Sequence, residues 1–540
     1  MGPFLLASIV VLTIYSVYRR WRTRISIADI PGPTADSSFL LGNMAELIQS
    51  EAGEADFKWQ KQFGHVMRLK GVLGTDRLFI SDPKTLHHIY GTMGYDICKQ
   101  KLRCEMVRIV TGPGLAWASD ETHRRQRRIN SPAFGNSVAR SYVPVFSAYA
   151  NQLSSQWKDI IAEQGAVVVN TPKFFSRFFL DVIGEVAFDY QFGATNNDED
   201  LFARVMASVV PIFMIPTKAM IFVAGLLELL PMRVVRFVID HAPTQSLQNS
   251  RRARAMAVEI SKNLVDQKSE ALLAGKGKRD IMSLLVQANA SANPETSLTE
   301  PEIWAQMQTI MQAGHETTAN TLSFTMFELS RRPDVQTKLR AEILKMDQDI
   351  RARGDIEFTA EDFDNMPYTI AVMKEILRFH PVAFDNSHDV LVNDVVLPLS
   401  YPITTKSGKV ITELPIPKGT VIQVSFAGYN RHPDVFGEDA HQFRPERFLD
   451  DTVQHTIKLG VYGNVMTFGS GVRTCIGWRF AVYEFQAFLV ELVKNFEFSI
   501  DPTVAGKFRR TASLVMIPTM SGEEHKGPQL PIMIKSVERP

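Results

Sequence analysis

The sequence predicts one large, mainly α-helical domain with small β-sheets, preceded by an N-terminal transmembrane helix. Helical patterns dominate the chain, and short β-branched runs interrupt them at residues 66–69, 78–80 and 421–424. A chain of 540 residues can form two ordinary domains or one unusually large one. No internal repeat or long low-complexity tract follows residue 33, so we expect a single domain with a long central helix.

The N-terminal segment has the character of a membrane anchor. Residues 4–18 are apolar or weakly polar, and four arginines follow within residues 19–24. The run is shorter than the roughly 20 residues of a typical span, so a cleaved signal peptide is the alternative. No basic residue precedes the run and no small-residue cleavage site follows it, which favours a retained anchor with the downstream chain in the cytosol.

Three segments follow from this pattern. The prolines of Pro31-Gly32-Pro33 restrict the backbone and discourage helix, which indicates a stiff linker. We therefore expect an anchor over residues 1–18, a basic and proline-rich linker over residues 19–33, and the main domain over residues 34–540.

Composition excludes several functional classes. Lysine plus arginine (59) nearly balances aspartate plus glutamate (58), so nothing indicates a nucleic-acid partner. The cysteines Cys98, Cys104 and Cys475 are too few for a disulfide framework or a four-thiolate zinc site. One functional thiolate remains compatible with this count.

The strongest chemical motif surrounds Cys475. Residues 468–477 read Phe-Gly-Ser-Gly-Val-Arg-Thr-Cys-Ile-Gly and precede a helical pattern over residues 478–495. Glycines let the backbone fold compactly and leave amide hydrogens accessible, which a thiolate needs beside a flat macrocycle. A buried, inert cysteine is the alternative for an isolated residue. The pair Gly469 and Gly471 also half-matches a dinucleotide fingerprint, but the third glycine is absent.

This segment resembles the haem-binding loop of the cytochromes P450, in which phenylalanine, two glycines, arginine, cysteine and glycine recur at these intervals. The resemblance implies that Cys475 ligates the iron of haem b and that Phe468, Arg473 and Gly477 help to bind the haem, with Arg473 on a propionate. Three further family motifs occur in the expected order, and the anchor and hinge resemble those of eukaryotic microsomal members. The resemblance therefore covers nearly the whole chain.

A long helix carries the second motif. A capping box at residues 299–302 opens it and Pro333 ends it, giving a length of about 48 Å. Gly314 costs stability in a helix interior, and we expect a flat ligand or oxygen to pack against it. The resemblance implies that Glu316 and Thr317 are the acid and alcohol pair that relays protons to dioxygen. A solvated glutamate beside threonines bonded to their own helix is the alternative.

The third motif is a charged triad. Glu375 and Arg378 are three residues apart on one helix face, which alone indicates an ordinary ion pair. The segment at residues 443–448 resembles the family segment whose arginine completes a buried triad. The resemblance thus implies that Arg447 joins Glu375 and Arg378 and that the three brace the haem loop.

The fourth motif departs from the family pattern. His123 stands where relatives usually have tryptophan, and Arg127 keeps the arginine one turn later, so both can donate to a haem propionate. His388 stands where many relatives have another propionate-binding arginine. The remaining arginines, Arg124, Arg125 and Arg128, form either a solvated face or a docking site for an acidic reductase.

The substrate pocket follows from position along these motifs. On the long helix Thr309, Ile310 and Ala313 precede Thr317 by one to two turns and should face the pocket. The opposite wall is expected from the segment after the triad helix, at Phe384, Asp385 and Asn386. The polar pair Asp385 and Asn386 indicates a hydroxyl or carbonyl on an otherwise lipophilic substrate such as a terpenoid, sterol or other secondary metabolite.

These features together predict a haem-thiolate monooxygenase of the endoplasmic reticulum membrane with a cytosolic catalytic domain. The chain has no complete dinucleotide fingerprint or phosphate-binding loop, so the resemblance implies that NADPH supplies electrons through a separate cytochrome P450 reductase. Residues 209–230 are unusually apolar and offer a second membrane contact. A haem-thiolate isomerase or dehydratase that needs no external electrons, and a non-catalytic haem-binding protein, are the alternatives.

Overall fold

The computed structural model describes residues 25–33, 39–195, 216–274, 280–290, 293, 297–390 and 393–537. The predicted anchor, the first part of the linker at residues 19–24 and the apolar residues 209–215 lie outside these ranges. Within them, no helix is both long enough and apolar enough to cross a membrane.

Helices make up most of the described chain. In order they are α2 (Met44–Gln49), α3 (Glu54–Phe63), α4 (Pro83–His87), α5 (Lys101–Thr111), α6 (Asp120–Asn130), α7 (Asn136–Ser141), α8 (Val143–Gln164), α9 (Thr171–Phe188), α11 (Lys218–Glu228), α12 (Met232–His241), α13 (Gln245–Leu273), α14 (Ile281–Ala290), α15 (Glu300–Ser330), α16 (Pro333–Ala352), α17 (Ala360–Asp364), α18 (Pro367–Phe379), α19 (Phe426–Tyr429), α20 (Pro433–Phe436), α21 (Trp478–Asn495) and α22 (Pro502–Ala505). Short helical turns are η1 (Val72–Gly74), η2 (His88–Thr92), η3 (Ser131–Phe134), η5 (Pro445–Phe448), η6 (Met466–Phe468), η7 (Gly471–Arg473) and η8 (Glu524–Lys526).

The strands form small, separate sheets. They are β1 (Val66–Lys70), β2 (Asp76–Ile80), β3 (Ile97–Lys99), β4 (Val167–Asn170), β5 (Asp385–Val390), β6 (Val395–Thr404), β7 (Val410–Ile416), β8 (Val421–Ser425), β9 (Phe496–Ser499), β10 (Phe508–Thr511), β11 (Ile517–Met520) and β12 (Pro531–Ser536). One sheet has the order β1-β2-β8-β5-β3, with β2 and β8 parallel; the others are β4-β12-β9, β10-β11 and β6-β7.

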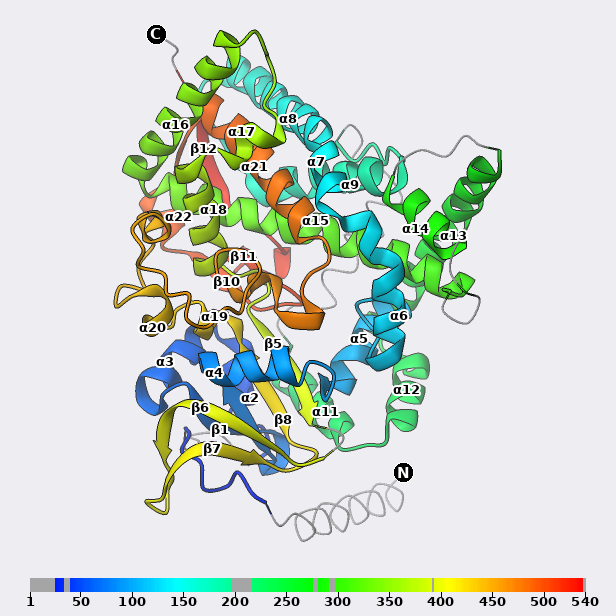
Figure 1. Ribbon diagram of the computed structural model, residues 1–540, viewed down its shortest axis with the longest axis vertical. Coiled ribbons are helices and arrows are strands. Elements are labelled where there is room, and N and C mark those ends of the chain that lie inside the picture. Colours follow the sequence, from blue (N-terminus) through cyan, green and yellow to red (C-terminus); the bar gives the residue numbers. More distant parts are fainter. Residues whose placement is uncertain are drawn as a thin grey trace.

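The arrangement places α15 through the centre of the molecule. In Figure 1 the five-stranded sheet and the β6-β7 hairpin lie at the lower end, and helices fill the upper part. The largest core cluster joins α8, α9, α15 and α21 and buries aromatic side chains, among them Trp157, Phe179 and Phe488. A second cluster lies under the sheets. Helix α15 is therefore held on several sides and can present a fixed face to a cavity.

The predicted elements that position the motifs are confirmed. Strands β1, β2 and β8 cover the three β-branched runs, and α21 spans the predicted residues 478–495. Helix α15 begins with the expected capping box, in which the side chains of Thr299 and Glu302 each accept a hydrogen bond from the other residue's backbone N–H. The mainly helical single-domain architecture is thus the one that the sequence indicates.

The end of the linker is packed on the domain. Ile27 and Ile30 are buried in the cluster beneath the sheets, and the amide of Arg68 in β1 donates to the carbonyl of Pro31 at 2.8 Å. Gly32 is required at this crossing, because a Cβ there would lie 1.9 Å from the Arg68 carbonyl oxygen. Residues 27–32 therefore dock on the domain.

Candidate active site

The loop before α21 presents Cys475 at the helix start. Its amide donates to the carbonyl of Phe468 at 2.7 Å, which closes the loop into a compact turn. Gly469 and Gly471 have φ values of 69° and 60°, in the left-handed region that favours glycine. A Cβ on Gly471 would also lie 1.9 Å from the carbonyl oxygen of Tyr90 in η2. These glycines thus serve the fold of the loop as well as access to the cysteine.

Cys475 is accessible to solvent although it lies deep in the protein, so its sulfur faces an internal hollow. Burial raises the pKa of its thiol, whereas donation from the backbone N–H of Gly477 and the charge of Arg127 act in the opposite direction. Both of these interactions favour a thiolate, which is the form that binds metals.

A group of cations surrounds this hollow. Arg127 donates to the carbonyl of Thr474 at 2.8 Å. Arg473 donates to the carbonyl of Ala118, also at 2.8 Å. Lys99 donates to the carbonyl of Ala116 at 2.6 Å. Burial and repulsion from Arg473 lower the pKa of Lys99 to about 8. Among the described residues, Arg473 Nη2 is buried without a hydrogen-bond partner. These buried cations are held by neutral carbonyl groups and repel one another. Such an arrangement is completed by an anion that neutralises their charge.

The two histidines of the sequence analysis occupy different positions. His123 in α6 is buried, and its Nδ1 forms a hydrogen bond with the hydroxyl of Tyr95 at 2.9 Å. Burial and the charge of Arg473 lower its pKa to about 2, so the imidazole is neutral. His388 in β5 is held by the hydroxyl of Tyr90 at 2.9 Å, and burial lowers its pKa to about 3. Each can offer one hydrogen bond rather than a charge.

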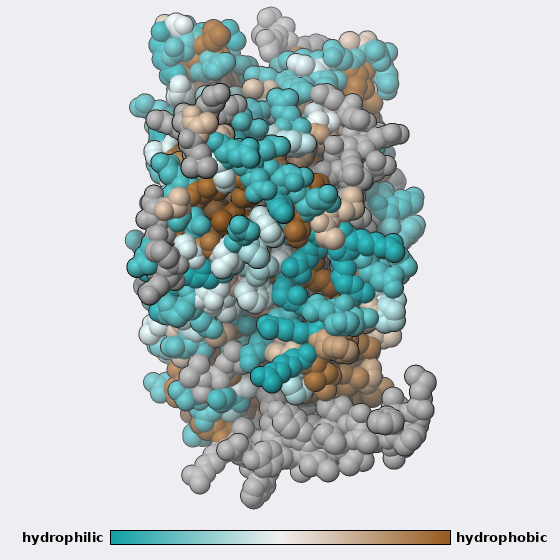
Figure 2. Space-filling model, turned by 90° about the vertical axis from the view of Figure 1, so that its right-hand side faces the viewer, coloured by the Kyte–Doolittle hydropathy of each residue, from teal (hydrophilic) through white to brown (hydrophobic). Residues whose placement is uncertain are grey.

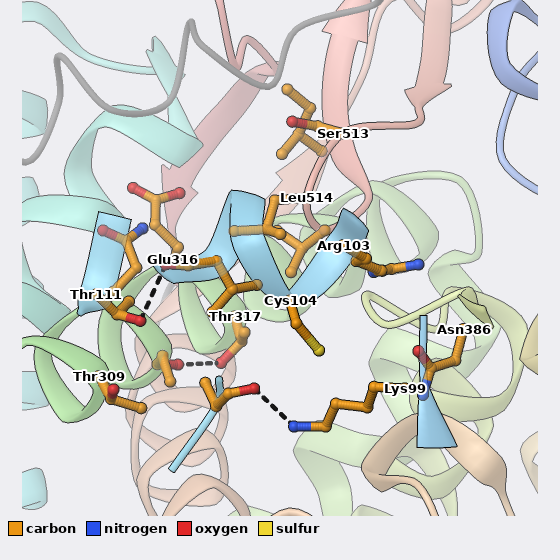
Figure 3. Close-up of a pocket in the computed structure, with 16 residues that line it drawn as sticks. Lys99, Arg103, Cys104, Thr111, Thr309, Glu316, Thr317, Asn386, Ser513 and Leu514 are labelled. Atoms are coloured by element: carbon orange, nitrogen blue, oxygen red, sulfur yellow. Dashed lines mark hydrogen bonds between the residues drawn. The ribbon is translucent and has the colours of Figure 1, made fainter. Parts of the chain in front are cut away.

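A cavity of about 300 Å³ lies beside α15. In Figure 3, Thr309, Glu316 and Thr317 form one side, and Lys99, Arg103 and Asn386 form another. Its lining residues are Lys99, Arg103, Cys104, Val107, Thr111, Ala116, Thr309, Gln312, Ala313, Glu316, Thr317, Asn386, Ser513, Leu514, Val515 and Ile517. Polar groups at defined places on an otherwise apolar wall are typical of a small-molecule site.

Three predicted pocket residues do not line this cavity. Ile310 packs against the main core cluster, and Phe384 packs against a small cluster around Phe324. Asp385 pairs with Arg103 at 3.1 Å and accepts from Gln423 at 2.6 Å. Helical rotation turns Ile310 away from the cavity. Strand alternation turns Asp385 to the opposite face from Asn386.

Much of the opposite wall comes from segments that the motifs did not indicate. Helix α5 contributes Arg103, Cys104, Val107 and Thr111, and the turn between β10 and β11 contributes residues 513–515. Neither segment carries a motif. The mixture of apolar and basic residues in α5 is typical of an amphipathic helix, with one apolar face and one polar face.

The acid and alcohol of α15 are brought to the same cavity but do not bond to each other. Thr317 donates to the carbonyl of Ala313, one turn earlier, at 2.8 Å. The structure gives a second reason for Gly314 besides contact with a flat ligand or oxygen, because a Cβ there would lie 2.6 Å from Ile183 of α9. Gly314 is needed for close helix packing, which leaves the neighbouring face of α15 for the cavity.

The triad forms a buried ion network. Both oxygens of Glu375 accept from Arg378 at 2.7 Å, Arg447 Nε lies 3.1 Å from Glu375, and none of the three side chains is exposed. Arg378 also donates to the carbonyl of Asn430 at 2.9 Å, and the Asn430 side chain accepts from the amide of Met466 at 2.8 Å. Asn430, which sequence reasoning missed, therefore connects the triad to the cysteine loop.

Comparison with known proteins decides the family. The sequence profile of the cytochrome P450 family matches residues 31–522. The chain belongs to the cytochrome P450 family. Similar relatives include cytochrome P450 monooxygenase claP of Ampulloclitocybe clavipes, 30% identical over 96% of this chain and 94% of its own length. Cytochrome P450 monooxygenase 205 of Postia placenta is 31% identical over 94% and 93%. The chain is thus a cytochrome P450 monooxygenase.

Membership implies a haem, and the P450 site fits this group. Haem carries two propionates, and none of the cations Lys99, Arg127 and Arg473 around the hollow forms an ion pair within the part of the chain that the structure describes. The unpartnered Arg473 Nη2 is a donor available to such a carboxylate. Cys475 supplies a thiol at the same hollow. The sequence motifs did not indicate Lys99, because it lies on β3, outside every motif.

Proposed function

We propose that this P450 inserts one atom of O2 into a lipophilic terpenoid, sterol or other secondary metabolite, using electrons that NADPH provides through a separate cytochrome P450 reductase. The observation that carries this proposal is that the acid Glu316 and the alcohol Thr317 line the same cavity as the apolar side chains of Val107, Leu514 and Ile517. When bound, haem supplies the redox centre at which oxygen is reduced and transferred.

The roles of the chain's own residues follow from their positions. Cys475 is the proposed iron ligand, and Arg127, Arg473 and Lys99 hold the propionates, with His123 donating one hydrogen bond. The apolar wall orients the substrate and excludes water. Thr317 and Glu316 move protons toward the cavity, since a hydroxyl can donate a proton and a carboxylate can accept and release one at its edge.

A threonine variant tests this proton delivery. Replacement of Thr317 by alanine leaves the haem residues untouched, so haem content and electron uptake should stay near wild type. Product formed per NADPH oxidised should fall about ten-fold, because electrons leave as peroxide or water when protons are misdirected. The substrate is the compound, from a panel of terpenoids, sterols and fatty acids, that gives the largest shift in haem spin state.

A matched control lies two turns along the same helix. Thr325 is buried and donates to the carbonyl of Thr321 at 2.8 Å, as Thr317 does to Ala313, but Thr325 does not line the cavity. Thr325→Ala should retain the wild-type ratio of product to NADPH. An unchanged ratio in Thr317→Ala would limit Thr317 to helix packing and remove the support for this proton path.

We further propose that the protein is held at the endoplasmic reticulum membrane, with the catalytic domain in the cytosol. The apolar residues 4–18 and the following arginines support an anchor. Helices α11 and α12 add support, because they expose the apolar side chains Met220, Val223, Val234 and Phe237. Figure 2 shows apolar surface at the level of α12 on this face. Such a surface can rest in a lipid interface.

Truncation at residue 24 tests the anchor without disturbing the domain. Ile27 and Ile30 keep their buried positions in this variant, so its Tm should equal that of the full chain. The protein should move largely from the membrane pellet to the supernatant after centrifugation. A second truncation through residue 33 should lower stability by about 3 kcal/mol, from two lost isoleucines. Pelleting of the shorter truncation to the wild-type extent would contradict the anchor.

The reductase is proposed to dock near α6. Arg128 and Arg124 are exposed there, whereas Arg125 is engaged with Glu302 of α15 and is not available for docking. Arg125 therefore belongs neither to a solvated face nor to a docking site, because its guanidinium connects α6 to the start of α15.

A further inference from the structure

Behind the cavity, α15 carries a buried histidine beside its acid. His315 is 3% exposed, and its Nε2 lies 3.2 Å from Oε1 of Glu316. The hydroxyl of Ser176 in α9 donates to the same oxygen at 3.1 Å. Glu316 also lines the cavity, so the residue that contacts His315 and α9 belongs to the cavity wall.

The hydrogen bond of His315 identifies which of its ring nitrogens can exchange a proton with Glu316. Its Nδ1 lies 2.8 Å from the carbonyl oxygen of Met311. A carbonyl oxygen can only accept, so Nδ1 carries a hydrogen. Nε2 is then the ring nitrogen that can bind or release a proton beside Glu316. In its imidazolium form, the pair stores a proton at the edge of the cavity.

The electrostatics favour the charged arrangement at rest. Burial opposes both charges, but the hydrogen bond and charge of Glu316 raise the pKa of His315. Burial would likewise raise the pKa of Glu316, but His315 and donation from Ser176 lower it. Carboxylates on the packed helices are engaged elsewhere: Asp181 with the amides of residues 194 and 195, Glu185 with Tyr149, and Glu484 with Thr318.

We propose that His315 is a positioning residue that holds the proton which Glu316 delivers to the cavity. This inference rests on the proposed monooxygenase function. The proton passes from His315 Nε2 to a carboxyl oxygen of Glu316, and Glu316 releases it toward the cavity. Neutral imidazole and a carboxylate remain, and one proton from bulk water restores the pair. Ser176 keeps the carboxyl group in place during the transfer.

The chain offers a matched control pair, formed by Glu328 of α15 and His380 at the end of α18. His380 Nε2 lies 2.6 Å from Oε1 of Glu328, which is near the far end of α15, and both residues are buried. Neither lines the cavity. Burial lowers the pKa of His380 well below its ordinary value, so this imidazole is neutral. His380→Gln therefore removes a buried histidine from a glutamate without removing a stored proton.

The first readout is coupling, measured on the holoenzyme with reductase and the substrate chosen by spin-state titration. Glutamine at position 315 can still donate to Glu316 but cannot release a proton. Product per NADPH should fall about five-fold in His315→Gln and stay at the wild-type value in His380→Gln. The wild-type ratio should also decline as pH rises through the raised pKa of His315, whereas that of His315→Gln should be low throughout.

The second readout needs no turnover. The Tm of the holoenzyme is measured against pH without reductase or NADPH. When folding raises the pKa of a histidine, the protonated histidine stabilises the folded protein. This stabilisation is complete below the pKa of the unfolded chain, 6.5, and is lost as the pH rises through the pKa in the folded protein. The Tm of wild type should exceed that of His315→Gln by about 2 °C at pH 6 or below, and the gap should close at higher pH. The difference in Tm between wild type and His380→Gln should not close as the pH rises above 6.

The outcomes separate this inference from the proposed function. Uncoupling in Thr317→Ala with normal coupling in His315→Gln would overturn the role of His315 and leave the monooxygenase intact. A Tm gap for His315→Gln that persists unchanged at high pH would overturn the stored proton, since a purely structural histidine behaves in that way. Normal coupling in both variants would overturn the shared proton path itself.

Discussion

Replacement of Cys475 by serine is expected to abolish the thiolate-ligated haem spectrum. The reduced wild-type protein with carbon monoxide should show the red-shifted Soret band of such a haem. Cys475 is the accessible thiol at the hollow that the cations surround, and Gly477 and Arg127 favour its thiolate. A hydroxyl in its place is a much weaker donor to iron at neutral pH. The measurement is the carbon monoxide difference spectrum of the reduced protein.

Cys98→Ser provides the control. Cys98 is buried and its thiol donates to the carbonyl of Tyr95 at 3.3 Å, a bond that serine can also make. This variant should keep the red-shifted band at wild-type intensity. A red-shifted band of wild-type intensity in Cys475→Ser would contradict the assignment of the iron ligand.

Arg447→Met is expected to lower the free energy of unfolding by about 3–5 kcal/mol, because it leaves buried charge on Glu375 without one of its two partners. Arg447 also donates to Asp439 at 2.7 Å and to the carbonyls of residues 436, 439 and 442. Its loss should loosen the segment that supports the cysteine loop through Asn430. Haem content after purification and denaturant unfolding measure the two effects.

Lys338→Met is the matched control for this variant. Lys338 pairs with Glu446, beside Arg447 in the chain, at 2.9 Å, but the lysine side chain is 59% exposed. Solvent screens such a pair, so neither the unfolding transition nor the haem content should change. Equal effects of the two variants would show that the buried network does not differ from a surface ion pair.

Spacing along the chain was enough to predict the local parts of the site. The capping box, the proline at the end of α15 and the glycine-framed cysteine act through neighbours in the chain, so their spacing predicts their structure. The same holds for Glu375 and Arg378, which are one turn apart on α18. These elements also carry the family resemblance, which is why the fold and the enzyme class could be predicted.

Which surfaces meet depends on packing between elements that are distant in the sequence. Gly314 contacts Ile183 across 131 positions of sequence, and Ser176 reaches Glu316 across 140, so neither contact follows from spacing. The cavity wall from α5 and residues 513–515, and the inward cation Lys99, likewise depend on packing between distant elements. Helix rotation about its axis is fixed by its neighbours. The orientation of Ile310 toward the core, and of His315 behind Glu316, therefore became defined only when α9 packed on α15.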